Sequence, residues 1–211
     1  MTLRLAGSTS GYTEIDCPSV GGNNTLVLPT GNGSADQALV TNGSGTLSFA
    51  DRGRMTLATA QNSTSGTSID FTSIPSWVKR ITVMVQGVST SGTSQLLIRL
   101  GTGAGPTYAT TGYIGYTFNT SSSAVAGTSV TSGVPISNSP VAAGNYSGMA
   151  TIATLGSNAW VATSYLGGDN TQGTGGGGSI SLAAALTAVR ITTVNGTDTF
   201  DAGSINILYE G

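Results

Sequence analysis

Near its C-terminal end the sequence contains LTAVRITTV (residues 186–194), NGTD (195–198) and SINILYE (204–210). Apolar residues recur at every second position in the first and third of these runs, which is the period of a half-buried β-strand. The Asn195-Gly196 dipeptide between them tolerates positive φ at both residues and therefore favours a tight reversal. These segments predict strands joined by tight turns and place the chain in the all-β class.

The same alternation appears earlier in the sequence. Ile81, Val83 and Val85 alternate with polar Thr82 and Gln86, so we expect the first three to face a core. Strands at this spacing, separated by Gly and Ser turns, predict an antiparallel β-sandwich of jelly-roll type. No segment shows a convincing helical period; residues 182–186 are compatible with one helical turn at most.

Composition supports an ordered protein with little electrostatic surface. The 211 residues include 32 glycines, 27 serines and 33 threonines, only 8% are charged, and 38% are hydrophobic. That hydrophobic fraction is too high for a disordered chain. The net charge of −2, with Lys79 as the single lysine and six scattered arginines, offers no basic stripe for a phosphate backbone. No apolar run is long enough to cross a bilayer, and no secretion signal is recognisable. We expect a soluble protein with neither nucleic-acid binding nor membrane insertion.

The chain divides into two parts with different composition. Residues 1–54 are rich in Gly and poor in bulky side chains, whereas residues 55–211 contain the longer predicted strands. A segment as short as 1–54 needs a metal, disulfides or oligomerisation to become stable. The only cysteine, Cys17, has no partner within the chain and is interpreted as an inert packed thiol. Oligomerisation therefore remains as the expected source of stability for residues 1–54, which we interpret as a stalk or attachment region.

Residues suited to catalysis are scarce. Histidine is absent, which removes the Ser-His-Asp arrangement and the common zinc sites. The remaining carboxylates give no convincing acid pair, because Asp198 and Asp201 flank the Asn195-Gly196 turn, where a structural role is the simpler interpretation. We expect no enzyme activity, no metal and no cofactor. Binding of a calcium ion by loop oxygens is an alternative that the sequence leaves open. The carboxylates that could in principle form an acid pair are Asp70, Asp169, Asp198, Asp201 and Glu210.

A glycine run at residues 173–178 matches the letters of the dinucleotide fingerprint G-x-G-x-x-G. That motif works only between a strand and a helix, so we interpret the run as a flexible hairpin loop. It belongs to one of three long polar insertions, at 101–116, 119–145 and 167–179, that are predicted to be loops and a recognition surface.

Aromatic residues are candidate sugar contacts, because sugar rings stack on them. Tyr108, Tyr113 and Tyr116 cluster at the edge of the first insertion and are the candidate ligand-binding residues, with packing in the core as the alternative. Trp77 and Trp160 lie within strand patterns and are expected to be core residues.

Two sets of motifs resemble bacteriophage virion fibres. SIDFTSIPSWVKRITV (68–83) and VRITTVNG with DAGSINILYE (189–196 and 201–210) resemble the segments that open and close the C-terminal domain of tail-fibre and other virion fibre proteins. Residues 28–49 are similar to the fibre module L-P…G-x-x-x-Q-x-L-x-T-x-G-x-G-x-L-x-W, with Phe49 in place of the commoner Trp. The resemblance covers residues 12–50, 66–100 and 180–211, whereas 101–179 match only in composition.

This resemblance implies a homotrimer in the virion, assembled in the host cytoplasm. Its N-terminal region would contact other virion proteins, and its β-sandwich head would attach to a host surface polysaccharide or lipopolysaccharide. The main alternative is a purely structural role as a capsid decoration, head fibre, baseplate or collar component. A glycan-cleaving depolymerase is disfavoured, because fibre-borne depolymerases are generally much longer chains and this one lacks histidine.

Overall fold

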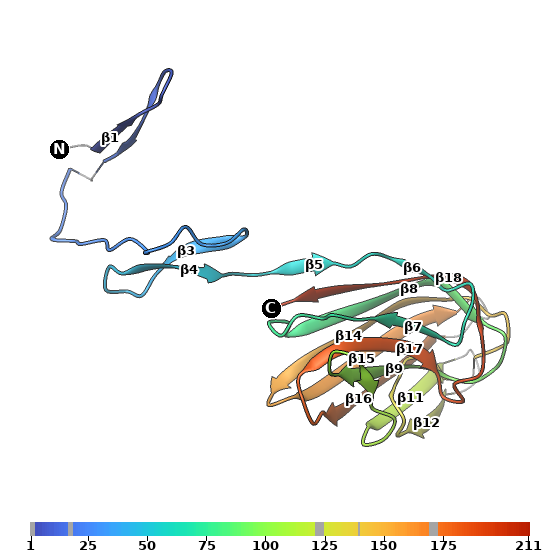
Figure 1. Cartoon of the computed structure of the whole chain (residues 1–211). Helices are drawn as coiled ribbons and strands as arrows, with labels where there is room; N and C mark the ends of the chain where they lie inside the picture. The colour runs from blue at the N-terminus through green and yellow to red at the C-terminus, as the bar shows by residue number, and fades with distance from the viewer. Residues whose placement is uncertain (1–2, 17–18, 121–124, 139, 169–172) are drawn as a thin grey trace. The chain divides into compact units, whose positions relative to one another are not determined.

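A computed structural model describes residues 3–16, 19–120, 125–138, 140–168 and 173–211. The protein is all-β, with 57% of residues in strands and no helix in the described ranges (Figure 1). The predicted all-β class with antiparallel sheets is therefore confirmed. Residues 182–186 form no helical turn, because 183–184 are a bend and Leu186 already belongs to a strand. Among the described residues, no helix is long and apolar enough to cross a membrane.

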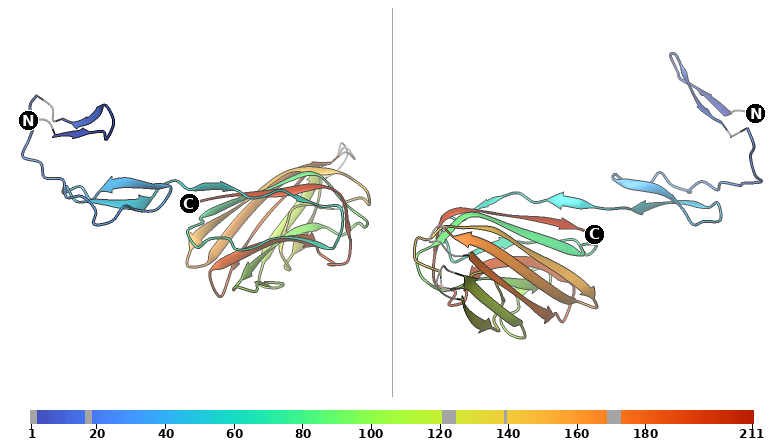
Figure 2. Two further views of the ribbon diagram at one scale, coloured as in Figure 1. Left: turned by 45° about the horizontal axis from the view of Figure 1, so that its top comes forward. Right: turned by 180° about the vertical axis from the view of Figure 1, so that it is seen from behind.

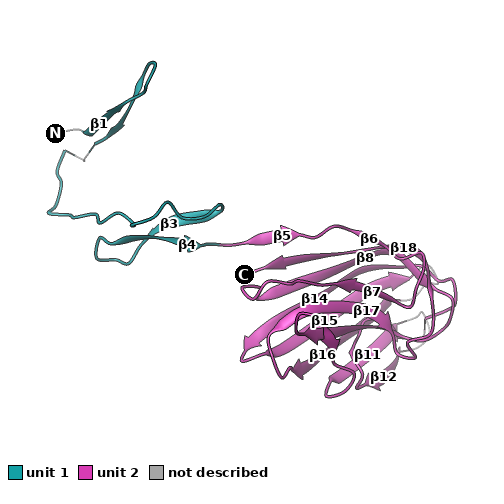
Figure 3. Cartoon of the chain, viewed as in Figure 1, with its two compact units in different colours: residues 1–52 teal, residues 53–211 magenta. Residues whose placement is uncertain are grey.

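The chain folds into two compact units, residues 1–52 and residues 53–211, compared with the boundary after residue 54 expected from composition (Figure 3). The first unit contains two separate antiparallel hairpins. One is formed by β1 (Leu3–Ala6) and β2 (Tyr12–Ile15), and the other by β3 (Gln37–Thr41) and β4 (Leu47–Asp51). Cys17 and its expected packing lie outside the described residues.

The described part of the first unit has no core within the single chain. None of its described residues is buried, and large apolar side chains such as Leu3, Ile15 and Leu39 are more than half exposed. Close packing joins Phe49 to Gly33, where an added Cβ would come within 2.6 Å of the ring. Gly33 also has a φ of 71°, so both space and backbone conformation require glycine there.

The second unit is a sandwich of two sheets that enclose one hydrophobic core (Figures 1 and 2). The larger sheet has nine strands and the smaller has five, with antiparallel pairing throughout. The smaller sheet comprises β7 (Ser68–Phe71), β9 (Leu96–Thr102), β10 (Thr107–Tyr108), β13 (Val134–Pro135) and β17 (Leu186–Thr193). The larger sheet comprises β5 (Met55–Leu57), β6 (Gln61–Asn62), β8 (Arg80–Thr90), β11 (Ile114–Thr120), β12 (Val125–Val130), β14 (Tyr146–Gly156), β15 (Ala159–Gly168), β16 (Gly173–Ser181) and β18 (Phe200–Glu210).

Alternation along β8 follows the prediction from sequence. Ile81, Val83 and Val85 are buried in the core, whereas Thr82 is half-buried and Gln86 is exposed. The core position predicted for Trp160 is confirmed. Trp77 is only partly buried and packs against the rim of the core, with its ring centroid 5.7 Å from that of Tyr209.

The three predicted loop insertions contain strands, so that part of the prediction was wrong. β10, β11, β12, β13 and β16 all begin within them, and the glycine run 173–178 forms most of β16, between β11 and β15. A Cβ at Gly176 would lie 2.5 Å from the carbonyl oxygen of Pro135, and one at Gly178 equally close to that of Ile114. Glycine is present because neighbouring backbone occupies the side-chain positions, not because the segment is a flexible loop.

The two ends of the second unit meet. The amide of Arg54 donates to the carbonyl of Gly211 at 3.1 Å, and the amide of Gly211 donates back to Arg54 at 3.0 Å. These bonds extend the pairing of β5 with the end of β18.

Candidate functional site

The three candidate tyrosines lie in three different layers of the sandwich. Tyr108 is on the outer face of the five-stranded sheet, Tyr113 is in the core between the sheets, and Tyr116 is on the outer face of the nine-stranded sheet. Short spacing in the sequence suggests one cluster, but the chain crosses the sandwich between residues 108 and 116. The three residues do not form a single site.

Tyr113 is a core residue. Its side chain is 3% exposed, and its hydroxyl oxygen accepts a hydrogen bond of 2.7 Å from the amide of Leu100. Burial raises the pKa of Tyr113 to about 12. The interpretation of Tyr113 as an exposed ligand contact is therefore wrong, and the alternative of core packing holds for this residue.

Tyr108 belongs to a cluster with Arg190 and Asp70. The guanidinium carbon of Arg190 lies 4.1 Å from the centroid of the Tyr108 ring, and Arg190 holds Asp70 by two hydrogen bonds of 2.7 Å. Burial, followed by the negative charge of Asp70, raises the pKa of Tyr108 to about 12. Arg190 and Asp70 neutralise each other's charge. The cluster is therefore a stabilising contact that joins side chains of β7, β17 and β10.

Tyr116 forms part of an exposed aromatic surface. Together with Phe118 and Tyr165 it lies over glycines of neighbouring strands, and we call this set, with Gly127, Gly173 and Gly175, the aromatic–glycine face. A Cβ at Gly175 would lie 2.8 Å from the tip of the Phe118 ring, and one at Gly173 would lie 2.5 Å from the Tyr165 hydroxyl. The Tyr116 hydroxyl covers Gly127 in the same way.

The rings of the aromatic–glycine face are supported from below and open to solvent. Tyr116 is 56% exposed, Phe118 38% and Tyr165 61%. Phe118 and Tyr165 both pair with Gly175, from β11 and β15 respectively, so they flank the glycine strand in one row. With two sheet spacings between them, their Cα atoms are about 10 Å apart.

Among the described residues, the side chains around these rings are mainly uncharged. Exposed Thr163, half-buried Thr151 and half-buried Ser179 offer polar groups, and Ile114 and Met149 offer exposed apolar ones. Arg80 and Glu210, the charged pair on this face, lie towards one end of β8 and β18 and bond to each other. The arrangement therefore suits an uncharged ligand that combines apolar faces with hydroxyl groups.

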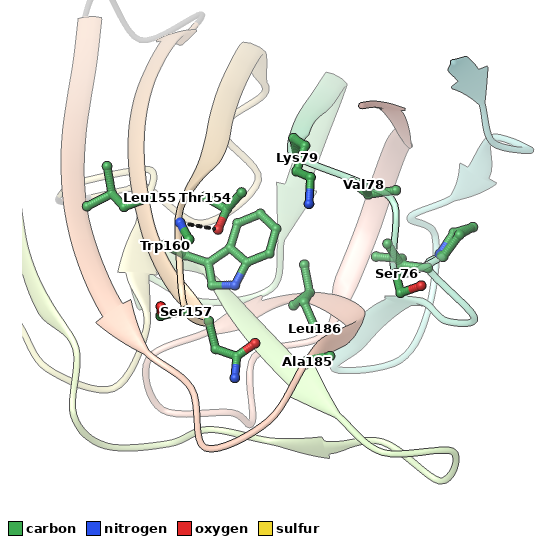
Figure 4. A pocket seen from close by; sticks show the side chains of 13 residues that line it. Ser76, Val78, Lys79, Thr154, Leu155, Ser157, Trp160, Ala185 and Leu186 are labelled. Carbon is green, nitrogen blue, oxygen red and sulfur yellow. Dashed lines mark hydrogen bonds between the residues drawn. The ribbon is translucent and has the colours of Figure 1, made fainter. Parts of the chain in front are cut away.

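A pocket of about 430 Å³ lies elsewhere on the second unit, and we call it the Trp160 pocket (Figure 4). Three segments bring it together, namely the β7–β8 connection, the β14–β15 hairpin and the start of β17. Its lining comprises Ile74, Pro75, Ser76, Val78, Lys79, Thr154, Leu155, Gly156, Ser157, Asn158, Trp160, Ala185 and Leu186.

The hairpin turn of the Trp160 pocket is tightly constrained. Ser157 and Asn158 have φ values of 50° and 62°, which is the conformation of a two-residue turn with positive φ at both positions. Thr154 reinforces the turn, because its hydroxyl accepts from the amide of Gly156 at 3.0 Å and donates to the carbonyl of Ala159 at 3.1 Å. The backbone of Ser157 and Asn158 is therefore held in place at the pocket wall.

The carboxylates singled out from sequence have mainly structural partners. Asp198 accepts from the amide of Ser94 at 2.9 Å and from the side chain of Asn195 at 2.7 Å, which confirms its structural role at the turn. Glu210 bonds to Arg80. Asp169 lies outside the described residues. Within the described ranges, no group of three or more His, Cys, Asp or Glu side chains is placed to hold a metal ion.

Comparison of the chain with protein-family models, with curated proteins and with solved structures found no match in any of the three. The site must therefore be interpreted from its own geometry. The aromatic–glycine face had a signal in the sequence, since Ile114, Tyr116 and Phe118 alternate with small or hydroxyl residues beside a glycine-rich segment. The Trp160 pocket had none, because its lining comes from three distant segments.

Proposed function

We propose that this chain is a bacteriophage virion fibre protein whose head, residues 53–211, attaches to a surface glycan of the host. The observation that carries the proposal is the aromatic–glycine face, where three rings lie over glycine backbone with one side free. A pyranose ring has an apolar C–H face that stacks on such a ring, while its hydroxyls bond to neighbouring polar groups. Tyrosine is suited to this contact because it is rigid and partly polar.

The first unit supports an oligomeric attachment role. Large apolar side chains are exposed along the first hairpin and at Leu39 in the second, and none of its described residues is buried. Chains that pack these side chains together would supply the core that one chain lacks. We propose a homotrimer, in keeping with the resemblance to fibre proteins, joined to other virion proteins through residues 1–52.

Trimerisation would also determine the strength of attachment. A neutral surface with a few stacked rings binds one sugar chain weakly, since each ring contributes about 1 kcal/mol by analogy with aromatic pairs. Three heads on one fibre, and several fibres on one particle, convert weak sites into firm attachment by raising the effective concentration. The proposed function is binding without catalysis.

Adsorption of the purified protein to host cells tests the proposal. The variant Tyr116→Ala/Phe118→Ala/Tyr165→Ala should keep its circular dichroism spectrum and melting behaviour, because these rings are exposed, but should lose most adsorption. The matched control Tyr116→Phe/Tyr165→Phe keeps every ring and should adsorb nearly as well as the unmodified protein. Full adsorption of the folded Ala variant would refute the aromatic–glycine face as the receptor contact.

A structural role in the particle is the second candidate. Ile114 and Met149 on the same face are exposed aliphatic residues, and aliphatic surface of this kind favours protein contacts over sugar contacts. If the Ala variant adsorbs normally but is no longer incorporated into particles, the face is an assembly surface.

A further inference from the structure

The Trp160 pocket contains more hydrogen-bond donors than the protein itself satisfies. The side chains of Ser76, Ser157 and Asn158 line it, and none of the three makes a side-chain hydrogen bond to another described residue. Trp160 is 6% exposed, and its indole N–H is buried without an acceptor in the described part of the chain. Only the indole N–H is a buried donor, of a kind that is normally paired. Ser76 and Ser157 are exposed and Asn158 is half-buried, so a ligand in the pocket can replace the water that bonds to these three side chains.

The charge of the pocket is positive. Lys79 is the one charged residue in its lining, and Figure 4 shows its side chain and the indole of Trp160 at the same hollow. The carbonyl of Glu210 accepts from the amide of Lys79, but the carboxylate of Glu210 is bonded to Arg80. Within the described residues, Lys79 therefore makes no ion pair, and no acidic side chain lines the pocket to compete for its ammonium group.

Most of the remaining lining is apolar. Ile74, Val78, Leu186 and the indole of Trp160 form the apolar part of a space of about 430 Å³, which lies within the usual range for small-molecule sites. A ligand that fits must combine an apolar face, several hydroxyls and a negative charge.

We propose that the Trp160 pocket binds the carboxylate end of an acidic sugar, such as a hexuronic acid. Lys79 pairs with the carboxylate, Ser76, Ser157 and Asn158 bond to the ring oxygens and hydroxyls, and the apolar wall packs against the C–H face. This site is separate from the aromatic–glycine face. It rests on the proposed glycan attachment for the choice of a sugar ring, but the preference for an anion comes from the pocket alone.

Tryptophan fluorescence of the intact, full-length protein tests this assignment directly. The variant Trp77→Phe leaves Trp160 as the only tryptophan, and in that background we would titrate glucuronate against glucose, which share their ring stereochemistry. Glucuronate should bind in the millimolar range, and glucose roughly tenfold more weakly or worse. Lys79→Gln should abolish this preference, whereas Lys79→Arg should keep most of it.

The control Arg52→Gln removes one positive charge from an exposed residue of the first unit and should leave the titration unchanged. Equal binding of glucose and glucuronate, no response to either sugar, or an unaltered preference in folded Lys79→Gln would each overturn the assignment. None of these results depends on adsorption to cells. Adsorption lost through the aromatic–glycine face with no glucuronate binding would thus reject the pocket proposal alone, and the reverse pattern would reject that face alone.

Discussion

Asp70 and Arg190 lie directly opposite each other on β7 and β17 and are joined by two parallel hydrogen bonds of 2.7 Å. β7 is the first strand of the five-stranded sheet in chain order, and β17 is the last. The pair therefore links the side chains of neighbouring strands at residues that are 120 positions apart in sequence.

Removing this pair should cost moderate stability. Both side chains are about one-third exposed, so solvent screens their attraction, and we expect a coupling energy of about 1 kcal/mol. The measurement is a double-mutant cycle of urea unfolding with Asp70→Asn, Arg190→Met and the double variant. A coupling energy near zero would show that the bidentate contact contributes nothing beyond the two single side chains.

Opposite faces of β8 should respond differently to a carboxylate. Val83→Asp would bury an unpaired charge in the core and lower the free energy of unfolding by several kcal/mol. Thr82→Asp, on the neighbouring half-buried position of the outer face, should cost well under 1 kcal/mol. Thermal melting of both variants decides the matter, and equal shifts in melting temperature would contradict the assigned faces.

Glycine in β16 should resist substitution where a ring covers it. Gly175→Val would displace the Phe118 ring and lower the melting temperature, because the new side chain occupies the same space. Gly105→Ala is the matched control, since nothing lies within 4 Å of a Cβ there. If both changes are tolerated equally, the rings do not depend on the glycine strand.

High pH should lower the stability of the folded protein through the buried Tyr113 hydroxyl. Its pKa rises from 10.0 to about 12 in the folded protein, so the folded state holds the proton more tightly than the unfolded chain. The resulting stability is complete below pH 10 and is lost as the pH rises towards 12. We expect this residue to account for about 2 to 3 kcal/mol of that loss.

The variant Tyr113→Phe separates this effect from other tyrosines. It should be less stable at neutral pH by about 1 to 3 kcal/mol, because the Leu100 amide loses its acceptor, but its stability should fall less steeply with pH. Urea unfolding at several alkaline pH values gives both quantities, with Tyr116→Phe as the exposed control. An identical pH slope in Tyr113→Phe and the unmodified protein would argue against the raised pKa.

Light scattering tests the oligomer. We expect a mass three times the 20.9 kDa of one chain, because residues 1–52 have no core without partner chains. Removal of residues 1–52 should weaken the assembly. A stable monomer of the full chain at micromolar concentration would contradict the trimer.

Strands whose apolar and polar side chains alternate could be predicted from the sequence. Strands whose residues are determined by the packing of neighbouring backbone could not. The burial of Ile81, Val83 and Val85 could be predicted from their alternation with polar residues. The glycine run in β16 has no such pattern. Glycine is required there because Phe118, Tyr165 and Pro135, from distant segments, occupy the side-chain positions.

The candidate site shows the same division between local and distant information. Tyr116 lies at an exposed surface, which is one of the two placements that the sequence left open. Its spacing from Tyr113 and Tyr108 could not reveal that the chain crosses the sandwich between them. Trp160 was correctly placed in the core, but its pocket depends on Lys79 and Leu186, which only the folded sheets bring close.

The hydrogen bonds between Arg54 and Gly211 have a consequence for engineering. A short linker from Gly211 to Arg54 would close the head domain into a ring, and new termini could then be opened in a different loop. A peptide or fluorescent protein fused to Gly211 would emerge where the chain enters the domain. For tagging, immobilisation or display, the entry point and the fusion point of the head domain are therefore one location.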